Sequence, residues 1–149
     1  MDKVVFENVE KYVTEQLAKH NTSLEYKGYT VEPKTELVSV SKTICFETRA
    51  GTVLSLCVME EGYLTIFFTS TKAEEKTFFF DMYLEKFDQH AFREYWDAGM
   101  AARESKDFLR ILTSKLSYFL NYLDKSADLR AVLNGEKWFN IPFDFGGMR

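Results

Sequence analysis

The sequence predicts an α+β fold: an N-terminal helix, an antiparallel meander of four to five strands, two to three C-terminal helices and an aromatic tail. Three observations lead to this prediction. Apolar residues recur every three or four positions near both ends of the chain, as in amphipathic helices. Between these segments the apolar period is two, as in strands. Glycine-containing turn signals separate the strands. With 149 residues, the chain is expected to form a single α+β domain, 1–149.

The first helix is expected from about Asp2 to Lys19. The side chains of its inward face follow at spacings of three and four: Val5, Phe6, Val9, Tyr12, Val13, Gln16 and Leu17. Lys19 and His20 fall in the last turn, where cations interact well with the helix dipole. We therefore interpret His20 as a helix-end residue, and Asn21 as a residue that can end the helix in the left-handed conformation.

The strands begin after Asn21. SLEYKGYTVEP (23–33) is a candidate first strand that Pro33 stops, and 42–70 predicts a three-stranded meander. Loops at Ala50-Gly51-Thr52 and Glu60-Glu61-Gly62 would align the apolar residues on one core face: Ile44, Phe46, Leu54, Leu56, Val58, Leu64, Ile66 and Phe68. A further strand, KTFFFDMYLEK (76–86), adds Phe78, Phe80, Met82 and Leu84 to that face.

The same register predicts a second face that is too apolar to be simply solvated. Its members are Thr43, Cys45, Glu47, Arg49, Val53, Ser55, Cys57, Met59, Tyr63, Thr65, Phe67, Phe79 and Tyr83. We expect another segment or a partner to cover the patch around Cys57, Met59, Tyr63 and Phe67. The register also sets Cys45 opposite Cys57, which we interpret as two reduced thiols side by side, with a structural disulfide as the alternative.

Three helices are expected after Phe87. Asp88 can cap a helix to about Met100, with Phe92, Tyr95, Trp96, Gly99 and Met100 on one side. A second helix, 106–123, has Ser105 as its cap and follows a break across 103–105. A short helix, 126–133, ends at Asn134-Gly135. The order of a helix and then a meander resembles cystatin-like and secretion-chaperone-like folds, but only in element order, so it implies no site residues.

The sequence carries no catalytic signature such as a phosphate-binding glycine loop, H-E-x-x-H, G-x-S-x-G or C-x-x-C. The triplet Asp144-Phe145-Gly146 lacks the other motifs of a protein kinase. His90, Glu94 and Asp97 share one side of a predicted helix and could form an open metal site, or equally a solvated face. Cys57 as a nucleophile would need a base that neither histidine provides. We predict no cofactor and no metal.

Composition and net charge limit the classes of partner and the location that we expect for this protein. The net charge of −4, with acidic residues scattered among the basic ones, argues against nucleic acid as a partner and against nucleic-acid mimicry. No signal peptide or membrane span is recognisable, so a cytoplasmic location is expected. The two cysteines match neither a disulfide framework nor a zinc site.

The aromatic tail, 138–149, is the most distinctive segment. It can cover the second face of its own chain, exchange with a twin subunit to form a homodimer, or leave the patch open for a partner. The predicted binding residues are Cys57, Met59, Tyr63, Phe67, Trp138, Phe139, Phe143 and Phe145. We expect a non-enzymatic binding module, of the small inhibitor, immunity, chaperone or phage-modulator type, for a protein or small ligand. The alternative is a small enzyme or ligand-sequestering protein with its site near His90, Glu94 and Asp97.

Overall fold

A computed structural model describes residues 4–20, 23–72 and 76–142 of the chain. In chain order the elements are η1 (Phe6–Asn8), α1 (Val9–Ala18), β1 (Glu25–Glu32), β2 (Ser41–Glu47), β3 (Thr52–Met59), β4 (Leu64–Ser70), β5 (Lys76–Phe79), α2 (Phe80–Phe87), α3 (Gln89–Arg103), α4 (Phe108–Lys125) and α5 (Ala127–Leu133). This order confirms the predicted α+β class. Among these helices, none is both long and apolar enough to cross a membrane.

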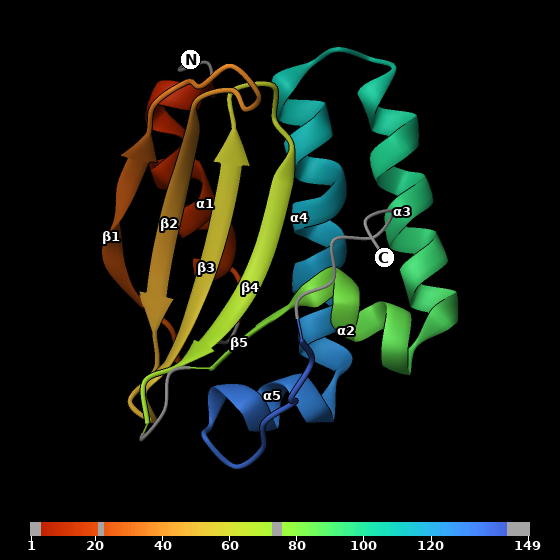
Figure 1. Cartoon of the computed structure of the whole chain (residues 1–149). Helices are drawn as coiled ribbons and strands as arrows, with labels where there is room; N and C mark the ends of the chain where they lie inside the picture. The colour runs from red at the N-terminus through yellow and green to blue at the C-terminus, as the bar shows by residue number, and fades with distance from the viewer. Residues whose placement is uncertain (1–3, 21–22, 73–75, 143–149) are drawn as a thin grey trace.

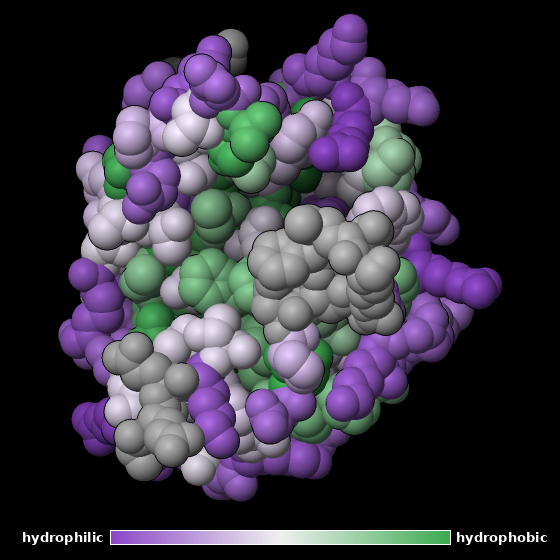
Figure 2. All heavy atoms as spheres, viewed as in Figure 1, coloured by the Kyte–Doolittle hydropathy of each residue, from purple (hydrophilic) through white to green (hydrophobic). Residues whose placement is uncertain are grey.

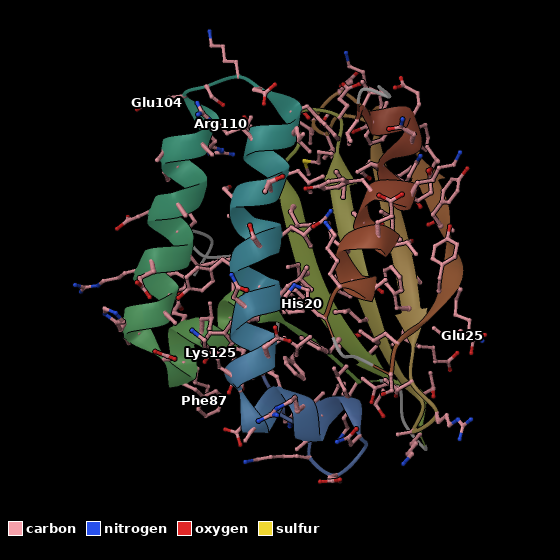
Figure 3. All side chains as sticks on the ribbon, turned by 180° about the vertical axis from the view of Figure 1, so that it is seen from behind. His20, Glu25, Phe87, Glu104, Arg110 and Lys125 are labelled. Carbon is pink, nitrogen blue, oxygen red and sulfur yellow. The ribbon has the colours of Figure 1, made fainter. Side chains whose placement is uncertain are left out.

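The strands form one antiparallel meander in the order β1-β2-β3-β4-β5. Helices α1 and α4 lie side by side over one face of this sheet, and α3 stands next to α4 beyond the β4 side (Figure 1 and Figure 3). The opposite face of β2, β3 and β4 has none of the described helices over it (Figure 1). The fold therefore has one sheet layer and one helix layer, and the apolar core is buried between them.

The core lies between the sheet and helices α1, α4 and α2. The predicted inward residues of β2, β3 and β4 are all buried, from Ile44 through Phe68, with at most 5% of their surface exposed. Helix α1 contributes Val9, Val13 and Leu17 to the core. The buried stripe of α4 consists of Ile111, Leu112, Leu116, Phe119, Leu120 and Leu123. The alternating pattern of the strands thus predicted the core face correctly.

The β3–β4 hairpin has the predicted register. Val58 pairs with Leu64, and the loop 60–62 is closed by the Met59 N–H donating to the Tyr63 carbonyl at 2.9 Å. Gly62 adopts a φ of +102°, and a Cβ there would lie 2.5 Å from the Phe108 carbonyl oxygen at the start of α4. Glycine is therefore required both by the turn and by the close approach of the hairpin to α4.

In the β2–β3 hairpin the predicted register is wrong by two residues. Ile44 pairs with Leu56 instead of Val58, because the loop is 49–51 instead of 50–52. The three-residue loop needs its left-handed residue in the third position, and Gly51, with φ +88°, is that residue. A shift of two leaves every side chain on its predicted face.

The predicted pairing of the cysteines is wrong for the same reason. Cys45 pairs with Ser55, whose Oγ lies 3.6 Å from the Cys45 Sγ, and Cys57 pairs with Thr43. Both cysteines are free thiols. They share the second face without being cross-strand neighbours.

The predicted strand 76–86 is wrong beyond Phe79. β5 ends there and α2 begins at Phe80, so Tyr83 belongs to a helix and is buried at 3% exposure instead of lying on the second face. Phe80 and Leu84, four residues apart, are both fully buried on the inner side of α2. Between 78 and 84 only Asp81 is polar, so the apolar period does not distinguish a strand from a helix there.

The later helices agree with the prediction apart from one cap. The Asp88 carboxylate accepts from the Ala91 N–H at 3.1 Å, and the Ser126 hydroxyl caps α5 by accepting from the Leu129 N–H. Asp107, and not Ser105, caps α4 by accepting from the Arg110 N–H at 3.0 Å. An aspartate carboxylate next to the first turn also interacts with the positive end of the helix dipole.

Polar contacts join α1 to the rest of the fold, among them the one between the Tyr12 hydroxyl and the Thr113 hydroxyl of α4, 3.0 Å apart. His20, at the end of α1, lies with its Nδ1 2.6 Å from the Asp124 carboxylate of α4, which agrees with a helix-end role (Figure 3). Lys42 of β2 is 3% exposed, and its Nζ lies 2.6 Å from the carboxylate of Glu10. The predicted terminator Asn21 lies outside the described residues.

Candidate functional site

The second face of the sheet is the first part of the candidate site. We define it by eight of the outward residues of β2 to β5: Thr43, Cys45, Ser55, Cys57, Met59, Thr65, Phe67 and Phe79. All of them except the buried Ser55 are half-buried. The rings of Phe67 and Phe79 lie 5.3 Å apart. Apolar side chains run across the middle of this side of the molecule, and hydrophilic ones surround them (Figure 2).

A cleft of about 230 Å³ adjoins the second face. Its lining residues come from α3, from α4 and from the end of the sheet where β3 turns into β4. The sheet contributes Met59, Tyr63 and Thr65 to its lining. Two of the predicted binding residues, Met59 and Tyr63, therefore meet here, while Cys57 and Phe67 lie further along the second face.

Helix α3 supplies the opposite wall of the cleft. Trp96, Met100 and Arg103 follow one another at i, i+4 and i+7, so they lie on one side of the helix. Trp96 is 52% exposed and Met100 is 44% exposed. Large apolar side chains that stay this exposed beside a cleft are a feature of binding surfaces.

Two cations line the cleft, and both lie against aromatic rings. The guanidinium of Arg103 lies 4.2 Å from the centre of the Tyr63 ring. The Nζ of Lys115, from α4, lies 4.9 Å from the Tyr95 ring centre and 5.9 Å from that of Trp96. Among the described residues, neither cation forms an ion pair.

The position of Lys115 in the cleft, partly buried and close to Arg103, changes its pKa. Burial lowers the pKa of Lys115; the negative charge of Asp81 acts in the opposite direction, and the positive charge of Arg103 lowers it further. The two cations are thus close enough to repel each other. An anion between them would favour the charged form of Lys115.

Gly99 gives Lys115 its path to the cleft. A Cβ at Gly99 would lie 2.5 Å from the Cε of Lys115. Glycine in the middle of a helix is unfavourable by roughly 0.5–1 kcal/mol relative to alanine. Here the missing side chain leaves space for the lysine stem to cross α3.

His90, Glu94 and Asp97 do not line the cleft. The His90 side chain is 87% exposed, with its Nε2 3.6 Å from a Glu94 oxygen. The same Glu94 oxygen accepts from the Tyr118 hydroxyl at 2.9 Å. Burial, and then the hydrogen bond to Glu94, raise the pKa of Tyr118 to about 12. Within the described part of the chain, no three His, Cys, Asp or Glu side chains are grouped so that they could hold a metal ion.

The described part of the tail packs at the edge of the core. The Trp138 ring lies 5.0 Å from that of Phe78, a core-face residue of β5, and Phe139 lies 4.9 Å from Tyr83. Among the described residues, the buried indole N–H of Trp138 has no hydrogen-bond partner. The predicted binding residues Phe143 and Phe145 lie outside the described residues.

Sequence reasoning did not select the α3 and α4 side of the cleft. Trp96, Gly99 and Met100 are predicted on one side of their helix together with Phe92 and Tyr95, and nothing in the sequence marks Arg103 or Lys115 as site residues. The available signal was a glycine in mid-helix, close to a Trp, a Met and an Arg that share one side of that helix.

No family model, no curated protein and no solved structure matches this chain.

Proposed function

We propose that this chain is a non-enzymatic binding module. It engages a protein or a small ligand through the second face, the adjoining cleft and the C-terminal segment. The supporting observation is that a partly apolar sheet face, with none of the described helices over it, continues into a cleft where Trp96 and Met100 remain about half exposed. Apolar surface of this kind, with polar residues at its rim, is typical of interaction sites.

The alternative of an enzyme with its site at His90, Glu94 and Asp97 has less support. Glu94 already accepts a hydrogen bond from Tyr118, and His90 projects into solvent. A general base works from within hydrogen-bond reach of a substrate held in a concave site. These three side chains are on α3 but do not face the cleft.

Affinity capture with matched variants tests the proposal. The tagged full-length chain, Phe67→Glu and Val31→Glu would be used to capture components from an extract of the cells that make the protein. Phe67 lies on the second face, whereas Val31 is an exposed apolar residue of β1 that pairs with Lys42 of β2. Mass spectrometry of proteins and of small molecules identifies what is retained.

We expect a component that the wild type and Val31→Glu retain and Phe67→Glu loses. Thermal unfolding of the three proteins shows whether Phe67→Glu remains folded. A component that all three retain equally would contradict binding through the second face. Light scattering of the purified chain separates a second copy of the chain from a different partner.

A further inference from the structure

We propose that the cleft between β4 and α3 binds a small organic anion, with a carboxylate attached to a flat apolar ring. The inference rests on the proposed function, because it names the ligand class for one part of that binding surface. Arg103 and Lys115 would hold the carboxylate, and the rings and thioethers of the walls would hold the apolar body.

The positive charge of the cleft is the first argument for an anionic ligand. Arg103 and Lys115 reach it from different helices, and within the described residues no carboxylate pairs with either. Burial and the positive charge of Arg103 both disfavour the charged form of Lys115, and the negative charge of Asp81 opposes them only in part, because the pKa of Lys115 is still lowered. A carboxylate bound between Arg103 and Lys115 would offset both effects. Arginine suits this role because its planar group can donate two parallel hydrogen bonds to a carboxylate.

The apolar walls of the cleft are the second argument, and they indicate a flat ring in the ligand. Met59 and Met100 present thioethers, which adapt to an aromatic ring and interact favourably with it. Trp96 adds a ring that is about half exposed. The volume of about 230 Å³ is below the range of roughly 300–1,000 Å³ that is typical for drug-sized ligands. The cleft therefore suits one ring system with one charged group.

The two tryptophans allow a direct test, because each gives one indole N–H signal in an NMR spectrum. Trp96 lines the cleft, and Trp138 packs against Phe78 at the core edge. The full-length chain is titrated with 1-naphthoate, with the neutral analogue 1-naphthylmethanol and with inorganic phosphate. Trp138→Phe assigns the two signals.

We expect 1-naphthoate to shift the Trp96 signal to saturation while the Trp138 signal stays in place. The neutral analogue and phosphate should each bind at least about tenfold more weakly, because each lacks one half of the recognition. Lys115→Met and Arg103→Gln should each weaken naphthoate binding about tenfold or more. The matched controls Lys125→Met and Arg110→Gln, at exposed residues of α4 that do not line the cleft, should bind like the wild type.

Several results would overturn the inference. If naphthylmethanol bound as tightly as naphthoate, the two cations would not contribute to recognition. If phosphate bound as tightly as naphthoate, the ring would not contribute. The inference would also be wrong if Lys115→Met and Arg103→Gln bound naphthoate with unchanged affinity, or if naphthoate did not shift the Trp96 signal. If capture still depends on Phe67 in that case, the proposed function stands and only the ligand class is wrong.

Discussion

The buried ion pair between Lys42 and Glu10 gives a prediction whose size follows from the structure. Lys42 is 3% exposed and Glu10 is 9% exposed. The lysine Nζ lies 2.6 Å from the Glu10 carboxylate and donates to the Glu7 carbonyl at 2.9 Å. Lys42→Met leaves the Glu10 carboxylate without its partner, so unfolding should require about 3–5 kcal/mol less free energy than in the wild type.

A double-mutant cycle measures this effect by urea unfolding of the wild type, Lys42→Met, Glu10→Leu and the double variant. Each single variant leaves one buried charge, that of Glu10 or that of Lys42, without its partner. The double variant removes both charges. The double variant should therefore be less destabilised than the sum of the singles by at least about 2 kcal/mol. A loss below about 1 kcal/mol in Lys42→Met, or simple additivity, would refute the account of this pair.

Three further predictions concern the cleft and its surroundings. Gly99→Ala should change the free energy of unfolding by less than about 1 kcal/mol, because only the flexible end of Lys115 must move, yet it should weaken naphthoate binding in the NMR titration. Trp138→Phe should unfold at nearly the same urea concentration as the wild type, since the indole N–H has no hydrogen-bond partner to lose within the described part of the chain; a large loss of stability would reveal one. Tyrosinate absorbance should show Tyr118 titrating near pH 12, since burial and Glu94 raise its pKa. The raised pKa means that this contribution to stability is present below pH 10 and is lost as the pH rises through about 12. Glu94→Gln should lower that pKa, but not to 10.0, because the effect of burial, the first cause, remains.

The faces of the central strands could be predicted from the sequence because their period of two is regular. Leu54, Leu56 and Val58 are all fully buried, as expected. The β2–β3 register could not be obtained in the same way, because a shift of two residues gives the same faces. Only the position of Gly51 within its loop distinguishes the two registers. At β5 the continuous apolar run removed the periodic signal altogether.

The candidate site was predicted only on its sheet side. Met59 and Tyr63 follow from the strand pattern, and both line the cleft. Trp96 and Met100 resemble core residues in an apolar helix stripe, and only the packing of α3 beside α4 leaves them exposed. The roles of Arg103 and Lys115 depend on contacts between elements far apart in sequence, which a single sequence does not specify.

The central claim is that ligands contact the second face and its cleft, and methionine methyl NMR tests it most directly. Met59 and Met100 line the cleft, whereas Met82 packs against the core from α2. With selectively ¹³C-labelled methionine, adding the captured component should shift the Met59 and Met100 signals and leave that of Met82 unchanged. A shift of Met82 with unchanged Met59 and Met100 signals would contradict the claim.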